Sequence, residues 1–123
     1  MNPEIIQKVI VSMFQIPEDY RAALAKIASE SNILKKQSIN DCILHALDFY
    51  LNLPQGTQTQ PLLPKLPLRA FTVRSSKALK EKISHCAAIW QLKTSMPISM
   101  NAVVNTAILV YLQNHIQGYS QPF

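Results

Sequence analysis

Residues 38–51 read SINDCILHALDFYL, and residues 99–112 read SMNAVVNTAILVYL. The second stretch repeats the apolar pattern of the first, 61 positions later. In each copy the apolar residues are spaced by three and one in alternation, which places them on one side of an α-helix. They are Ile39, Cys42, Ile43, Ala46, Leu47, Tyr50 and Leu51, and then Met100, Val103, Val104, Ala107, Ile108, Tyr111 and Leu112. A helix that occurs twice in a short chain indicates two copies of one small unit.

Size and composition favour a folded chain in which the two copies share a core. Of the 123 residues, 48% are hydrophobic, which excludes a disordered tail. A half of about 60 residues would be only marginally stable alone. No apolar run approaches the roughly 18 residues of a membrane span. The start of the chain, Met1–Glu4, lacks the basic and apolar regions of a secretory signal, so we expect a cytoplasmic protein.

The net charge of +5 is unevenly distributed. Residues 1–61 hold five basic and six acidic side chains, whereas residues 62–123 hold seven basic and one acidic. A basic half favours a polyanionic partner, either nucleic acid or an acidic membrane surface. The alternative is a solvated surface of one sign that has no such partner.

Each copy of the repeated helix follows a predicted strand and a predicted helix. Residues 8–16 are rich in β-branched and aromatic side chains and end at Pro17, which with two acidic residues opens a helix. Ser38 is a good N-cap for the next helix, and Asp41 makes an imperfect capping box with it. In the second copy, residues 69–74 form the strand, Ser75 or Ser76 caps a helix, a loop runs from Lys93 to Pro97, and Ser99 caps the last helix. The apolar faces of the two first helices are Tyr20, Ala23, Leu24, Ile27 and Ala28, and Leu79, Ile83, Cys86, Ala87 and Trp90.

Residues 53–67 separate the copies and contain four prolines and one glycine. We expect no regular element there, only a partly extended linker.

One strand followed by two amphipathic helices cannot close a core, because the strand has an open edge. Two such units can, if their strands pair antiparallel and four helices cover one face of the ribbon. This layout resembles the ribbon-helix-helix superfamily, the MetJ, Arc and CopG type of DNA-binding protein. The resemblance covers roughly residues 8–52 and 68–116. It rests on the strand ending in Ile16-Pro17, on the face Tyr20, Leu24 and Ile27, and on the helix starts Ser38-Ile39-Asn40 and Ser99-Met100-Asn101.

Members of that family normally work as homodimers of single units. Both units lie in one chain here, which is similar to the tandem arrangement of TraY-type relaxosome proteins and of the T-DNA transfer enhancer of plant-tumour plasmids. We therefore expect a mostly α-helical protein with a two-stranded antiparallel ribbon, in which residues 1–52 and 68–123 form an intramolecular pseudo-dimer around one core. The resemblance leaves open whether such pseudo-dimers associate further on DNA or with other DNA-processing proteins.

In the family, the ribbon enters the major groove of DNA and its outward side chains meet base edges. Strand residues alternate between faces, and Phe14, Ile16, Phe71 and Val73, with Ser12, are expected to face the helices. The opposite parity implies a base-reading set of Val11, Met13, Gln15, Ala70, Thr72 and Arg74. Arginine suits guanine, glutamine suits adenine, and the apolar and threonine side chains suit thymine methyl groups. A register error of one residue would reverse the two sets, and Val11 and Met13 would then be ordinary core.

Phosphate contacts are expected at the start of each second helix, where backbone N–H groups are unpaired and the helix dipole is positive. The residues concerned are Ser38, Ile39, Asn40, Ser99, Met100 and Asn101, with Lys35, Lys36 and Lys93 just upstream. Such contacts position a protein on DNA without reading its sequence. The alternative is that the two serines only cap helices.

Metal and catalytic signatures are not found in the sequence. His45, His85 and His115 lack metal-ligand spacing, although Cys42 and His45 lie three residues apart. No nucleophile elbow, Walker motif or glycine-rich phosphate loop is present. We therefore expect neither an enzyme nor a cofactor, and we expect Cys42 and Cys86 to be reduced, buried thiols.

Two functions of different classes remain after these exclusions. The first is a protein that binds double-stranded DNA, as a transcriptional regulator or as an accessory factor in plasmid transfer or maintenance, with no membrane partner. The second is a small helical interaction module, antitoxin-like or an adaptor, whose ribbon does not meet DNA. Arg69, Arg74 and the lysines near the helix caps favour the first, and the few charges on the first strand favour the second.

Overall fold

The computed structural model describes residues 9–30 and 37–119, and it contains the predicted strand-helix-helix order twice. The first unit comprises β1 (Val9–Pro17), α1 (Glu18–Ser29) and α2 (Ile39–Leu51). The second comprises β2 (Leu68–Ser76), α3 (Lys77–Thr94) and α4 (Met100–His115). A short 3₁₀ helix, η2 (Gln55–Thr57), lies in the connection between the units. The protein is therefore mostly helical, with one repeated β-α-α unit.

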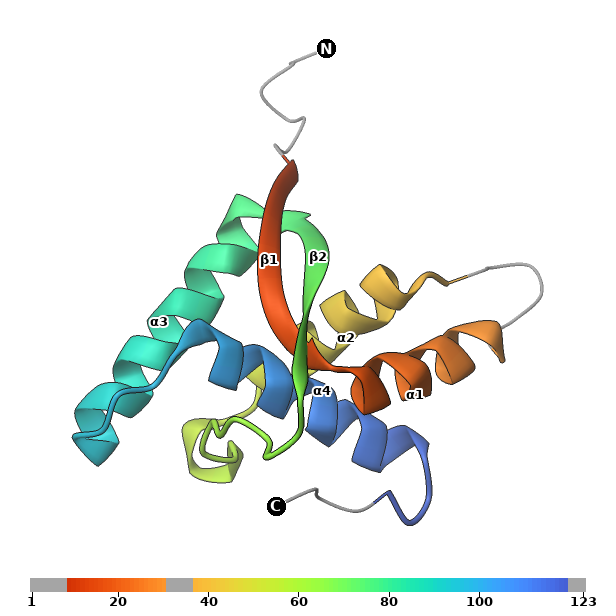
Figure 1. Cartoon of the computed structure of the whole chain (residues 1–123). Coiled ribbons are helices and arrows are strands. Elements are labelled where there is room, and N and C mark those ends of the chain that lie inside the picture. Colours follow the sequence, from red (N-terminus) through yellow and green to blue (C-terminus); the bar gives the residue numbers. More distant parts are fainter. Residues whose placement is uncertain (1–8, 31–36, 120–123) are drawn as a thin grey trace.

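The two strands pair with each other as an antiparallel two-stranded sheet, so the ladder joins the two units (Figure 1). Met13 lies opposite Thr72 at the centre of the ladder, and the pairing runs from Val9 opposite Ser76 to Pro17 opposite Leu68. In Figure 1 the ribbon stands in front of the helices, and α2 and α4 meet behind it. The two units thus form the expected intramolecular pseudo-dimer.

Burial alternates along both strands in the predicted parity. Ser12, Phe14, Ile16 and Val73 are buried against the helices, and Phe71 is half-buried. Val9, Val11 and Met13 expose 66%, 63% and 67% of their surfaces. Because a shift of one residue would exchange these sets, the alternation fixes which face of the ribbon is solvated.

One hydrophobic core is built from both units. Leu24, Leu47 and Tyr50 of the first unit and Val103 and Leu112 of the second have no exposed surface and belong to the same cluster. Full burial of such side chains contributes about 1.5–3 kcal/mol each. The helix α4 lies at the centre of this core, and every residue from Ala102 to Leu109 in it is buried.

Serine side chains cap three of the four helices. The hydroxyls of Ser38, Ser76 and Ser99 each accept a hydrogen bond from the third backbone N–H of their helix. The Asp41 carboxylate accepts a hydrogen bond from the Ser38 N–H at 3.0 Å, so the capping box that looked imperfect in sequence is complete. Helix α1 instead follows Pro17 and begins with two acidic residues, as predicted.

The connection between the units corrects one prediction, because it contains η2 and is held firmly against the helices. The Thr106 hydroxyl of α4 accepts a hydrogen bond from the Leu62 N–H at 2.8 Å and donates one to the Leu62 carbonyl at 3.1 Å. The Trp90 indole N–H donates to Gln58 Oε1 at 2.7 Å, and the Tyr50 hydroxyl donates to the Thr59 carbonyl. These bonds tie the linker to α2, α3 and α4.

Helix α3 also corrects a prediction, because it continues through Lys93 to Thr94, where we expected a loop. It has 18 residues, whereas its counterpart α1 has 12. The helix ends at Ser95, which adopts a left-handed conformation with φ of 56° and donates its N–H to the Gln91 carbonyl. A left-handed residue commonly ends a helix, but glycine usually occupies this place, so the sequence did not reveal it.

Candidate nucleic-acid interface

The six predicted base-reading residues form three successive cross-strand pairs on the solvated side of the ribbon. Val11 lies opposite Arg74, Met13 opposite Thr72, and Gln15 opposite Ala70. Gln15 is half-buried and the other five side chains are exposed. We call this surface of Val11, Met13, Gln15, Ala70, Thr72 and Arg74 the ribbon face.

The ribbon face combines groups that can contact the edges of bases in the major groove. The Arg74 guanidinium offers paired donors, and the Gln15 amide offers both a donor and an acceptor. Thr72 carries a methyl group and a hydroxyl, and Val11 and Met13 supply apolar contact. Arg74 is the only charged member, so most of this surface is neutral.

The outer edge of β2 is closed by a side chain from the other unit. Asn40, in the first turn of α2, donates from Nδ2 to the Arg74 carbonyl at 3.0 Å. Its Oδ1 accepts a hydrogen bond from the Arg74 N–H at 2.8 Å. One amide therefore satisfies both backbone groups of a residue on the ribbon face.

The outer edge of β1 is closed in the equivalent way by α4. Asn101 Oδ1 accepts a hydrogen bond from the Gln15 N–H at 3.1 Å, and Asn105 Nδ2 donates to the Gln15 carbonyl at 2.8 Å. Gln15 and Arg74 occupy the same place in the two strands, and Asn40 and Asn101 occupy the same place in the two helices. The bonds are thus related by the pseudo-symmetry of the two units, and they hold the starts of α2 and α4 beside the ribbon face.

These bonds change how the predicted phosphate-binding residues can act. The side chains of Asn40 and Asn101 are engaged by the strands, and the hydroxyls of Ser38 and Ser99 are engaged by the caps. Ile39 and Met100 are half-buried and pack against the core. What each helix start offers an anion is therefore the backbone N–H groups of its first turn.

The two helix starts differ in charge. Asp41 lies in the first turn of α2, where hydrogen bonds from the Ser38 N–H and hydroxyl lower the pKa of its carboxyl group. The first turn of α4 holds no acidic residue. A carboxylate that stays ionised opposes an incoming phosphate, so the start of α4 suits phosphate better than the start of α2.

Of the three lysines that we predicted to contact phosphate, the structure describes only Lys93. Lys35 and Lys36 lie outside the described residues. Lys93 lies in the last turn of α3, where its Nζ sits 4.9 Å from the centre of the Trp90 ring. In Figure 1 this end of α3 is far from the ribbon.

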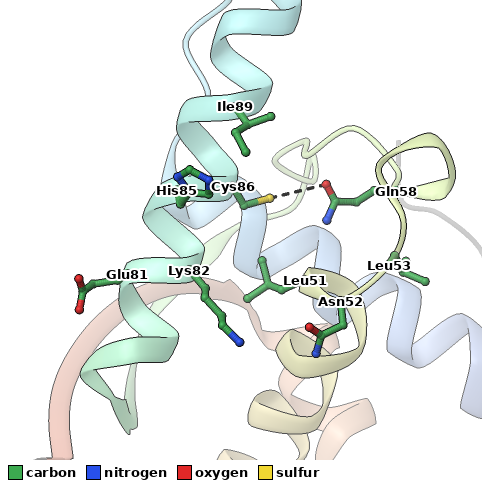
Figure 2. A pocket seen from close by; sticks show the side chains of 9 residues that line it. All are labelled: Leu51, Asn52, Leu53, Gln58, Glu81, Lys82, His85, Cys86 and Ile89. Carbon is green, nitrogen blue, oxygen red and sulfur yellow. Dashed lines mark hydrogen bonds between the residues drawn. The ribbon is translucent and has the colours of Figure 1, made fainter.

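A hollow of about 530 Å³ lies between α2, the linker and α3 (Figure 2). Leu51, Cys86 and Ile89 form much of its apolar wall, and Cys86 contacts Gln58. Burial raises the pKa of the Cys86 thiol, which keeps this group protonated and a poor nucleophile. In Figure 2 Glu81 and His85 project away from Gln58, so the titratable groups around this hollow do not converge on a common point.

Both cysteines, Cys42 and Cys86, are buried, as predicted, and they form no disulfide with each other. Within residues 9–30 and 37–119, no three His, Cys, Asp or Glu side chains come together as metal ligands. None of the helices described is both long and apolar enough to cross a membrane.

Comparison of the chain with known protein families, with curated proteins and with solved structures finds no match. The fold itself defines a class: two β-α-α units in one chain that pair through an antiparallel ribbon as a pseudo-dimer. This topology is the one that the ribbon-helix-helix resemblance led us to expect.

Proposed function

We propose that the protein binds double-stranded DNA by placing the ribbon face in the major groove. The observation that carries this proposal is the set of three exposed cross-strand pairs, held between two helix starts by Asn40 and Asn101. Neighbouring strands lie about 4.8 Å apart, and the B-DNA major groove, about 12 Å wide, admits a two-stranded ribbon. The starts of α2 and α4 would then flank the groove and meet phosphates.

The biological role that follows is that of a transcriptional regulator or of an accessory factor in plasmid transfer or maintenance. Both roles need a small protein that recognises a DNA site and has no chemistry of its own. The net charge of +5 supports attraction to a polyanion. The six residues of the ribbon face differ between the strands, so the bound site need not be palindromic.

A second candidate is a protein interaction module, and one observation favours it. Val9, Val11 and Met13 form an exposed apolar row along β1. Such a row suits a protein partner as well as thymine methyl groups. Binding to an apolar protein surface would depend weakly on salt, whereas DNA binding weakens steeply as salt rises.

The test is a titration of labelled duplex DNA, selected from a random pool, at several salt concentrations. Met13→Glu places a carboxylate on the ribbon face, where the side chain is 67% exposed, so the fold is retained while DNA binding is lost. Leu92→Glu is the matched control, because Leu92 is 84% exposed on α3 and lies outside the ribbon face. Loss of binding in Met13→Glu alone supports the proposal. Equal affinity of the two variants, or no salt-dependent binding by the natural protein, would overturn it.

A further inference from the structure

The two ends of the ribbon carry different charge. Where β2 passes into α3, the chain places Arg74, Lys77 and Lys80. Where β1 passes into α1, it places Glu18 and Asp19 in the first helical turn. These two junctions are equivalent in the pseudo-dimer, because each is a strand followed directly by the first helix of its unit.

Ion pairs determine how much charge each end presents. At the β1 end, Glu18 lies 3.2 Å from Arg21 and 3.6 Å from Arg69, so its carboxylate is shared between both nearby guanidinium groups. At the β2 end, Arg74, Lys77 and Lys80 form no ion pair with any residue that the structure describes. The β2 end of the ribbon therefore presents three cations that are in no ion pair, although the carboxylates of Asp41 and Glu81 lie on the two helices that begin there. The β1 end presents balanced charge.

The two ends are far enough apart to act on different parts of a DNA backbone. Each strand has nine residues, which corresponds to about 30 Å at 3.3 Å per residue. Charges are screened over about 8 Å at physiological ionic strength. Each end would therefore interact with the phosphates of its own flank and hardly with those of the other flank.

From this asymmetry, and resting on the DNA binding proposed above, we propose that basic side chains hold the DNA backbone on one flank only. Lys77 and Lys80 hold the backbone beyond the β2 end of the ribbon, next to the base-reading Arg74. Beyond the β1 end, only the backbone N–H groups at the start of α4 meet phosphate. The ribbon face determines which way round the protein lies on its DNA site. Gln15 and Arg74 occupy equivalent positions in the two strands, but their side chains suit different bases. The partner is thus a duplex that must extend past the recognised bases on a single side.

The experiment shortens a selected duplex from either end and measures its affinity for the natural protein and for the double variant Lys77→Ala with Lys80→Ala. Shortening one flank should weaken binding about tenfold, and shortening the other should change it less than twofold. In the double variant, shortening the sensitive flank should no longer weaken binding. The slope of log affinity against log salt should fall by about 2. Lys93→Ala, a cation at the far end of α3, should leave the flank dependence unchanged.

A gain-of-function variant completes the design. Glu18→Lys gives the β1 end a cation at the position equivalent to Lys77, so shortening the second flank should now weaken binding. Two results would overturn the one-flank contact and leave the proposed DNA binding intact. The first is an equal loss of affinity when either flank is shortened in the natural protein, and the second is an unchanged flank dependence in the double variant. If no duplex binds in a salt-dependent manner, the proposed function itself fails, and this inference fails with it.

Discussion

The side-chain amide of Asn40 spans both backbone polar groups of Arg74, with hydrogen bonds of 2.8 and 3.0 Å. The two residues are 34 positions apart and belong to different units. The strand that carries the charged member of the ribbon face is therefore held by the helix of the opposite unit. Closing a strand edge in this way also blocks pairing with another chain.

Removing these amides should weaken the fold. We expect Asn40→Ala to lower the free energy of unfolding by about 1 kcal/mol, because water can replace part of the lost bonding at an exposed edge. Asn101→Ala should cost about 1–2 kcal/mol, since the Gln15 N–H that it leaves is partly buried. Urea unfolding followed by circular dichroism measures both. Asn114→Ala, which changes an exposed residue of α4, is the control. An equally large loss of unfolding free energy in this variant would show that the hydrogen bonds of Asn40 and Asn101 do not stabilise the fold.

Because the two units share one core, a substitution that destabilises one unit should also destabilise the other. Leu24 of α1 is fully buried, so Leu24→Ala should cost about 2–5 kcal/mol. Trp90, the single tryptophan, lies in the second unit and reports unfolding there by its fluorescence. The unfolding midpoint measured by Trp90 fluorescence should be lower in Leu24→Ala. It should hardly change in Leu92→Ala, because the Leu92 side chain is exposed. An unchanged Trp90 midpoint in Leu24→Ala would mean that the units fold independently.

The linker should contribute to stability through Thr106. Thr106→Val keeps the shape of this buried side chain and removes both hydrogen bonds to Leu62, which should cost about 1–3 kcal/mol. Thr59→Val serves as the control, because the Thr59 side chain is exposed and its backbone carbonyl still accepts from Tyr50. Thermal unfolding of the two variants provides the comparison. Equal stability of the two variants would show that the hydrogen bonds between Thr106 and the linker do not stabilise the fold.

Stability should fall in alkaline solution because of the tyrosines. Burial raises the pKa of Tyr20, Tyr50 and Tyr119, and it raises the pKa of Tyr111 to about 12, from an ordinary value of 10.0. The unfolded chain releases these protons near pH 10 and the folded chain retains them, so stability is full below pH 10 and is lost as pH rises toward 12. Absorbance at 295 nm and circular dichroism should change together above pH 10. Tyrosine titration centred at pH 10 with the fold intact would contradict this burial.

The sequence predicted the repeated unit, the strand pairing and the solvated parity of the ribbon, because these follow from local apolar patterns. The apolar alternation through Phe14 and Ile16 was enough to place Met13 outside. The hydrogen bonds from the asparagine side chains to the strand edges were not predicted. Asn101 and Gln15 are 86 positions apart, and an asparagine near a helix start has several uses. The buried pair Asn105 and Thr106 carried a signal that could have been used: two polar residues interrupt an otherwise apolar helix where other backbone groups need partners.

The central claim is that the ribbon face reads DNA bases. The direct measurement is the affinity of the natural protein, Arg74→Ala and Lys93→Ala for a selected duplex and for a scrambled duplex of equal length, at one salt concentration. Loss of the Arg74 guanidinium should cost about 1–3 kcal/mol on the selected duplex and far less on the scrambled one. Lys93→Ala should weaken both duplexes alike or neither. An equal loss on both duplexes in Arg74→Ala would contradict base reading by the ribbon.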